Sequence, residues 1–307
     1  MYKNLIDYVD MLLAKYIKCN MYVFYMGLAR SLMAISTFLT LITNDERLLF
    51  KNRFSLNNVN SATFKPFTNY NIFEIVSVEQ LCILKWIICV FLLVVAIGWR
   101  PRFTGILHWY ISYCFFTAAA DIEGGDQIIS IVTFLLIPIC LLDNRKWHWI
   151  NERIMLNNES AILKRIVSNT FFLLIKIQVA ILYFHSALGK LEVQQWLNGT
   201  AIYYWINHPI FGISDWFKST ANYFFTNSYI AFIVSWGVII FELVLAAGLL
   251  LNRKCFKQLF IAGVIFHFFI IIFHGLPSFF LAMFSMLTLY FMIDYYNFKV
   301  HLSNGNG

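Results

Sequence analysis

The sequence predicts an all-α, polytopic membrane protein with about eight transmembrane helices. Of its 307 residues, 60% are apolar and only 13% are charged, whereas a soluble domain carries about 25% charged residues to cover its surface. Aromatic residues make up 19% of the chain, and 32 of them are phenylalanines, which suits helices that face lipid and end in tryptophan and tyrosine. This composition excludes a soluble enzyme.

The predicted transmembrane domain covers residues 21–295, because apolar segments of suitable length follow one another there. A helix of about 20 apolar residues crosses the hydrocarbon core of a bilayer, which is roughly 30 Å thick. A helix-breaking Gly275–Leu276–Pro277 sequence separates the last two segments. The predicted spans lie near 21–43, 80–99, 103–121, 127–142, 168–189, 226–251, 257–274 and 277–295.

The two ends of the chain are expected to lie outside the bilayer core. Residues 1–20 mix lysine and aspartate with apolar residues at helical spacing, such as Ile6, Val9 and Leu13. This pattern predicts an amphipathic helix on the membrane surface rather than a cleavable signal peptide. Residues 296–307 are expected to form a short cytoplasmic tail.

Loop charges predict the orientation of the spans. Fourteen lysines and arginines lie at the N-terminus, in the turn at 100–102, in the 143–167 loop, at 253–257 and in the tail, against six on the opposite side. Basic residues accumulate on the cytoplasmic side, so both termini are expected to be cytoplasmic. The loops 44–79 and 190–225 then lie outside, and the second, rich in aromatic residues, is expected at the outer interface.

Two further function classes are not favoured by the residue pattern. The formal net charge is +7, but the basic residues lie scattered in short loops, so nucleic-acid binding is not predicted. Six cysteines show neither a CxxC pair nor zinc spacing, and most lie in apolar spans, where a cysteine packs as a small hydrophobe.

Ionisable residues inside the predicted spans are the first candidate functional residues, since a charge in lipid costs several kcal/mol and usually faces the protein interior. Lys85 and Lys176 lie close enough to span ends to snorkel to the interface. Arg30 lies near mid-span and is expected to pair with Glu242 or Asp126. The spacing leaves open whether that pair is structural or functional.

Lys190 and three histidines extend this candidate site. His185 and Lys190 are five residues apart, about 140° around an ideal helix, but Gly189 can let Lys190 turn inward. A lysine in a dry pocket loses proton affinity and can act as a base, while the alternative is an interfacial lysine that binds headgroups. His267 and His274 share a helix face, and without an i, i+4 pair no metal site is predicted. Proton handling, ligand binding and packing all remain open for them.

Four blocks of sequence resemble the HTTM family, the membrane domain related to vitamin K-dependent gamma-carboxylase. They are GLARSLMAISTFLTLITN (27–44), GGDQIISIVTFLLIPICLLD (124–143), YFHSALGKLEVQQWLNGTAIYYW (183–205) and FHGLPSFFLAMFSM (273–286). The first block, with YMGLARS, resembles the SdpB (sporulation-delaying protein B) branch. The resemblance covers residues 20–295.

The resemblance implies a pathway, a place in the cell and a set of site residues. It implies maturation or modification of an exported peptide toxin or bacteriocin in the bacterial cytoplasmic membrane, with a small SdpA-like partner and a secreted peptide precursor. Lys190 matches the carboxylase base and keeps an acidic neighbour in Glu192. His274 matches a pocket histidine, and Asp126 stands where the family has another. His185, Arg30 and His267 are expected to bind a cofactor, for which the resemblance implies a reduced quinone.

Two alternatives compete with peptide maturation. The first alternative is a quinone-dependent, carboxylase-like enzyme. We expect no counterpart of the soluble portion that binds the carboxylase substrates, so the resemblance favours maturation over this reaction. The second alternative is a peptide transporter, or an immunity or scaffold protein without chemistry, whose activity would not depend on Lys190.

Overall fold

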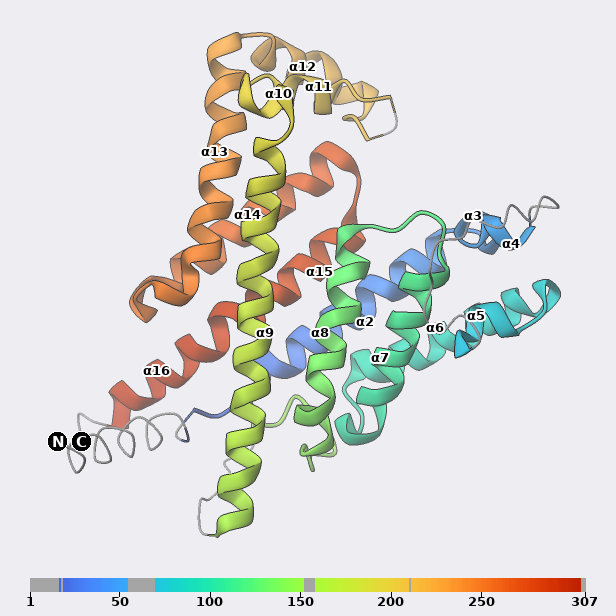
Figure 1. Cartoon of the computed structure of the whole chain (residues 1–307), viewed down its shortest axis with the longest axis vertical. Coiled ribbons are helices and arrows are strands. Elements are labelled where there is room, and N and C mark those ends of the chain that lie inside the picture. The colour runs from blue at the N-terminus through green and yellow to red at the C-terminus, as the bar shows by residue number, and fades with distance from the viewer. Residues whose placement is uncertain (1–16, 18, 55–69, 152–157, 210, 305–307) are drawn as a thin grey trace.

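The computed structural model describes residues 17, 19–54, 70–151, 158–209 and 211–304, and these residues fold almost entirely into helices (Figure 1). The predicted interfacial helix at 1–20 falls almost wholly outside the described residues. The long helices are α2 (Phe24–Thr43), α6 (Leu81–Ile97), α7 (Pro101–Ala118), α8 (Gly124–Leu141), α9 (Glu159–Leu191), α13 (Ser228–Ala246), α14 (Phe256–His274), α15 (Pro277–Leu287) and α16 (Ile293–Asn304).

Within the described residues, seven helical stretches are long and apolar enough to cross a membrane, which agrees with the all-α polytopic class. The predicted span near 103–121 corresponds to α7, which has 18 residues but is not among the seven. Pro101, Arg102 and His108 reduce its mean hydropathy. The last stretch, Pro277–Val300, joins α15 to α16 through a buried π-helical segment, Thr288–Met292.

Two apolar clusters hold the bundle together. The larger one joins α2, α8, α9 and α15 through buried residues such as Met33, Ile129, Val179 and Met286. The second joins α2, α6 and α7 to the short helix α5 (Ile72–Ile75). In Figure 1, α9 runs through the middle of the molecule, with α13 on one side of it and α8 on the other. These two neighbours build the candidate site described below.

Short helices cover one end of α9 and α13 (Figure 1). With 33 residues, α9 rises about 50 Å, which exceeds the hydrocarbon core of a bilayer. At its upper end follow α10 (Gln194–Leu197), α11 (Ala201–Ile206) and α12 (Asp215–Phe225). On α12, Trp216 and Tyr223 are 82% and 80% exposed, as expected for aromatic side chains at a membrane interface.

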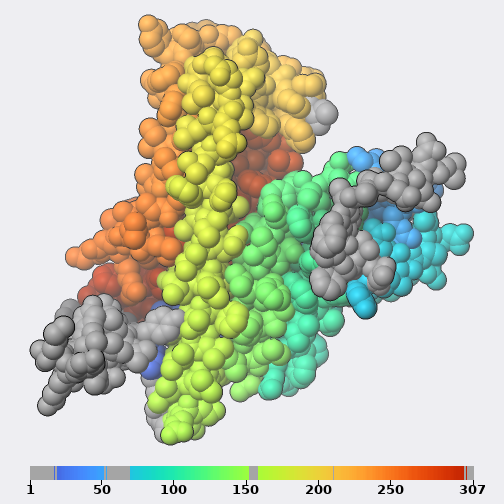
Figure 2. Space-filling view, in the orientation of Figure 1, coloured from blue at the N-terminus to red at the C-terminus, as the bar shows by residue number. Residues whose placement is uncertain are grey.

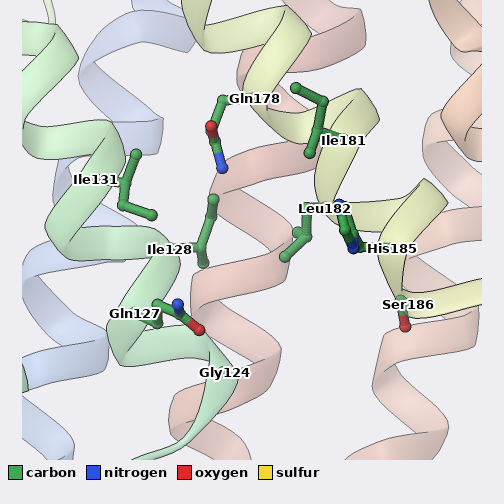
Figure 3. Close-up of a pocket in the computed structure, with 9 residues that line it drawn as sticks. All are labelled: Gly124, Gln127, Ile128, Ile131, Gln178, Ile181, Leu182, His185 and Ser186. Carbon is green, nitrogen blue, oxygen red and sulfur yellow. The ribbon is translucent and has the colours of Figure 1, made fainter. Parts of the chain in front are cut away.

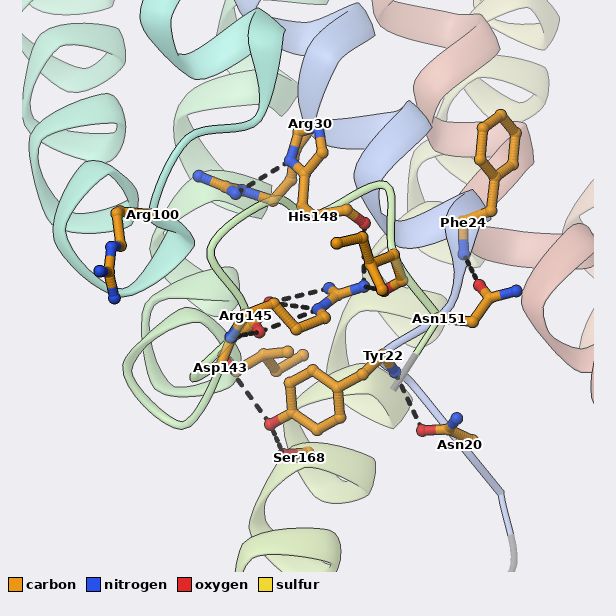
Figure 4. Close-up of polar contacts among 12 residues, drawn as sticks. Asn20, Tyr22, Phe24, Arg30, Arg100, Asp143, Arg145, His148, Asn151 and Ser168 are labelled. Carbon is orange, nitrogen blue, oxygen red and sulfur yellow. Dashed lines mark hydrogen bonds and ion pairs between the residues drawn. The ribbon is translucent and has the colours of Figure 1, made fainter. Parts of the chain in front are cut away.

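The opposite end of the bundle is closed by the loop 143–151, which folds back between α2 and α6 (Figure 4). The Arg145 guanidinium forms an ion pair with Asp143 at 2.8 Å and donates to the carbonyl oxygens of His148 and Ile150. The backbone of the loop also forms an antiparallel β-bridge, between Trp147 and Trp99. The loop is therefore held by both side-chain and backbone contacts.

Three charged side chains are bound differently from what the sequence predicts. Arg30 donates to Thr104 at 3.1 Å and lies 3.2 Å from the imidazole Nδ1 of His148 (Figure 4), so its expected pairing with Glu242 or Asp126 is wrong. The cause is the fold-back of the 143–151 loop, which brings His148 against the start of α2. The two lysines do not simply snorkel: buried Lys85 pairs with Glu46 at 3.0 Å and half-buried Lys176 with Asp294 at 2.8 Å.

Candidate functional site

The last turns of α9 carry a cluster of charged and polar side chains around Lys190. Its ammonium nitrogen donates to both carboxylate oxygens of Glu242, at 2.8 and 2.7 Å, and to the Ser186 hydroxyl at 2.8 Å. The Ser186 hydroxyl in turn donates to Glu242 at 3.0 Å. Ser186 and Lys190 are four residues apart and therefore share a face of α9, while Glu242 comes from the adjacent face of α13. The three side chains form a closed triangle of hydrogen bonds.

This cluster is largely shielded from solvent. The Lys190 side chain is 19% exposed and that of Glu242 is 7% exposed. The indole ring of Trp196, on α10, lies 5.4 Å from the Lys190 ammonium and covers it through a cation–π contact. Because the pair lies in a membrane-spanning bundle, separating the two charges would be costly, and a proton can pass between them without leaving the pair.

A cavity of about 440 Å³ lies next to this cluster, between α8 and α9 (Figure 3). One wall is the face of α8 that carries Gly124, Gln127, Ile128 and Ile131, and the other wall is a face of α9. In the space-filling view the surface is hollowed between the upper half of α9 and α8 (Figure 2). The α9 wall consists of Gln178, Ile181, Leu182, His185 and Ser186.

Ser186 connects the cavity to the charged cluster. It lines the cavity, and its hydroxyl oxygen contacts Lys190 and Glu242. The lining itself contains no aspartate, glutamate, lysine or arginine among the described residues. The cavity therefore has a neutral wall of apolar, amide, imidazole and hydroxyl groups, with one ion pair directly behind its Ser186 end.

The predicted site residues are distributed over different parts of the bundle. His185 lines the cavity, and Lys190 reaches it through Ser186. His267, on α14, is buried and its Nε2 lies 2.9 Å from the Tyr183 hydroxyl. His274 contacts the backbone carbonyl of Phe211 through Nδ1 at 2.7 Å. His267 and His274 are thus held by other residues and do not belong to the cavity lining.

Asp126 and its neighbour Glu123 lie at the start of α8. Asp126 is buried, and its carboxylate accepts a hydrogen bond from the backbone N–H of Glu123 at 3.2 Å, which caps the helix. Glu123 accepts hydrogen bonds from the Ser278 hydroxyl. Burial raises the pKa of the Glu123 carboxyl, and the Ser278 hydrogen bond opposes this shift. In this structure Asp126 orders the end of α8, next to the cavity residues Gly124 and Gln127.

The structure adds residues that the sequence interpretation missed. The sequence predicts Glu242 as a partner for Arg30, not for Lys190. It does not single out Ser186 or Gln178, although Ser186 lies one turn before Lys190 and Gln178 lies two turns before His185. The spacing of these residues on one helix was visible in the sequence. The position of Glu242, on a different helix, was not.

Comparison with known proteins identifies relatives over most of the chain. The chain is 38% identical over 264 residues to "Sporulation-delaying protein SdpB" of Bacillus subtilis (strain 168), covering 86% of this chain and 80% of that protein. It is 34% identical over 266 residues to "Uncharacterized protein YitO" of the same organism, covering 86% and 84%. No protein-family profile and no solved structure matches the chain. From the extent and identity of the first similarity, this chain belongs to the SdpB family of multi-pass membrane proteins.

Proposed function

We propose that this chain takes part in a sporulation-delaying toxin pathway, where it matures or modifies an exported peptide together with a small SdpA-like partner. The Lys190–Glu242 pair is the proton-transfer group of this activity. The proposal extends the role named for the 38% identical relative to this chain. It also extends the predicted role of Lys190 as a base, with Glu242 as the group that receives or returns its proton.

The observation that carries this proposal is the placement of a buried ion pair behind a neutral cavity. Charged groups in a membrane-spanning bundle are costly and are commonly found on substrate or proton pathways. Lys176 and Asp294 form another such pair, but among the ion pairs of the described residues it is the Lys190 pair that is joined to the cavity wall, through Ser186. This connection supports a role in chemistry for Lys190.

The geometry defines what the pair can do. A lysine acts as a base only after its ammonium has lost a proton, and Glu242 lies within 2.8 Å of that nitrogen as an acceptor. A proton that leaves Lys190 can pass to Glu242, and the neutral amine can then take a proton from a group held at the Ser186 end of the cavity. The proton is returned through the same pair. Ser186 orients the nitrogen and stays in contact with both partners.

The competing interpretations make different use of the same residues. A carboxylase-like enzyme would hold a reduced quinone against the neutral wall around His185, which fits the hydroxyl groups of such a ring. A transporter or immunity protein would need the cavity but no proton transfer. It would therefore tolerate any substitution of Lys190 that keeps the positive charge.

The test is Lys190→Arg, assayed by mass spectrometry of peptides exported by cells that make the variant or the unaltered chain. Arginine keeps the positive charge and can pair with Glu242, but it does not release a proton near neutral pH, because its pKa is above ~12. We expect the mature peptide to disappear while the protein level in the membrane stays normal.

Lys176→Arg is the matched control, because Lys176 lies in the same helix and is also bound to a carboxylate at 2.8 Å. This variant should mature the peptide normally. Full maturation by Lys190→Arg at normal abundance would refute the proton-transfer role and favour transport or sequestration. Normal exported peptides from cells that lack the chain would refute the pathway itself.

A further inference from the structure

Three polar side chains in the cavity wall lack hydrogen-bond partners among the residues that the structure describes. Gln127 lies on α8, and Gln178 and His185 lie on α9. Gln178 is half-buried in the middle of α9, a helix long and apolar enough to cross a membrane, where an unsatisfied amide costs free energy because lipid offers no hydrogen bonds. Gln127 and His185 are exposed, in the first turn of α8 and the last two turns of α9. Neighbouring polar side chains such as Ser186 and Tyr183 are paired within the protein. The three unpaired groups are therefore available to a ligand.

The spacing of these groups indicates a ligand that extends along the cavity. Gln178 and His185 are seven residues apart, so they lie on one face of α9 and about 10 Å apart along its axis. Ile181 and Leu182 lie between them. A distance of about 10 Å equals three residues of an extended peptide, at roughly 3.3 Å each. One small ring would meet one end of this row, whereas successive peptide groups can meet both.

The chemistry of the groups also matches a peptide backbone. Each glutamine amide offers an N–H donor and a carbonyl acceptor, which is the same pair that a peptide group presents. Gln127 and Gln178 come from opposite walls of the cavity (Figure 3), so they can pair with groups on two sides of a chain. Isoleucine and leucine side chains supply apolar surface between them. A neutral wall favours a segment without charged side chains.

We propose that this cavity binds a short, uncharged and extended segment of the exported peptide, whose backbone pairs with Gln127, Gln178 and His185. This inference rests on the proposed function, because it takes the peptide as the substrate. The volume of about 440 Å³ lies within the range of roughly 300–1,000 Å³ typical of small-ligand sites, which limits the segment to a few residues. Its end at Ser186 lies beside the Lys190–Glu242 pair.

The experiment uses the full chain with a photoreactive benzoyl-phenylalanine at Ile181, in cells that make the peptide identified by the export comparison above. Illumination should produce an adduct with the mass of the peptide precursor. The same residue at Ile240, an exposed position of α13 outside the cavity, is the control and should give no such adduct. Adding Lys190→Arg should preserve the adduct, because binding does not need proton transfer.

Substitutions in the wall provide the second measurement. Gln178→Leu should reduce the yield of the adduct about fivefold, the effect of one lost hydrogen bond worth about 1 kcal/mol, and Gln127→Leu should act similarly. Gln178→Asn keeps the amide and should retain more of the yield than Gln178→Leu. An adduct only with a lipid or a quinone, or equal yields for the leucine variants, would overturn the inference.

Failure of the proposed function is distinguishable from failure of this inference. If no exported peptide depends on the chain, the proposed function fails. The cavity is then tested on the purified protein in lipid nanodiscs, with an acetylated and amidated peptide of leucine, valine and glycine as the probe. An adduct at Ile181 that is absent at Ile240 supports a peptide site, and equal labelling at both positions overturns it. If a dependent peptide exists but gives no adduct at Ile181, only the binding site is wrong.

Discussion

Removing the negative charge of Glu242 should destabilise the folded protein strongly, and removing both charges should restore most of the loss. In Glu242→Gln, the Lys190 ammonium stays in a nearly closed environment and faces a neutral amide instead of a carboxylate. Its remaining contacts are to Ser186 and to the ring of Trp196. Neither contact supplies a full counter-charge.

The size of the effect follows from the geometry of the pair. At 2.7 Å between Nζ and Oε2, two unit charges attract each other by about 6 kcal/mol at an effective dielectric constant of 20. Breaking a buried pair by removing one partner costs roughly 3–5 kcal/mol in practice. Because the Lys190 side chain keeps 19% of its exposure, we expect about 3 kcal/mol for Glu242→Gln. Lys190→Met combined with Glu242→Gln should cost about 1 kcal/mol or less.

The assay is reversible unfolding of the purified protein in detergent micelles, followed by tryptophan fluorescence across a denaturant series for both variants. Peptide export is measured in parallel. The double variant should be nearly as stable as the unaltered chain and yet export no mature peptide, which separates folding from chemistry. A loss below about 0.5 kcal/mol for Glu242→Gln would show that the pair is open to water, and would refute the burial on which the proton-transfer proposal depends.

Burial, reinforced by neighbouring guanidinium groups, lowers the pKa of His148 to about 2. The unfolded chain binds a proton there below its usual pKa of ~6.5, so stability should fall by about 1.4 kcal/mol per pH unit below that pH. His148→Gln should remove this part of the slope in thermal unfolding between pH 5 and 7, and an unchanged slope would contradict it. Gly98→Ala should cost about 1–3 kcal/mol in the same assay, because Gly98 has φ 92° and its Cβ would overlap the His148 ring; a loss below 0.5 kcal/mol would contradict it. Ser219→Cys should react with an impermeant maleimide in intact cells and Lys146→Cys only after lysis, and the reverse result would invert the orientation.

The fold class was predictable from the sequence because hydropathy is a local property. Each apolar stretch of suitable length indicates a helix without reference to its neighbours, and the break at Gly275 and Pro277 was visible in the same way. Gly275 takes a left-handed conformation at φ 65°, and Pro277 begins α15. Periodicity would also have indicated that Gln178 and His185 share one face of α9.

The pairing of charges was not predictable, because it depends on which helices pack together. Lys190 and Glu242 are 52 residues apart, and Arg30 and His148 are 118 apart. His148 lies in a loop that the hydropathy pattern places outside the spans, yet it is fully buried against Gly27 and Gly98. Hydropathy indicates that a charged side chain inside a span needs a partner, but it does not indicate which residue is that partner.

The two sides of α9 suggest how this family member separates folding from ligand binding. Lys176, Tyr183 and Lys190 follow one another at seven-residue intervals, and each contacts a titratable group of another helix: Asp294, His267 and Glu242. These contacts fasten α9 to α13, α14 and α16. On the side that faces α8, Gln178 and His185 line the cavity and have no side-chain hydrogen-bond partners among the described residues. Because the contacts of Lys176, Tyr183 and Lys190 fix the position of α9, the polar groups on its other side are held in place and can still bind a ligand. Ser186 belongs to both sides, and it is therefore the residue through which a ligand in the cavity would meet the Lys190–Glu242 pair.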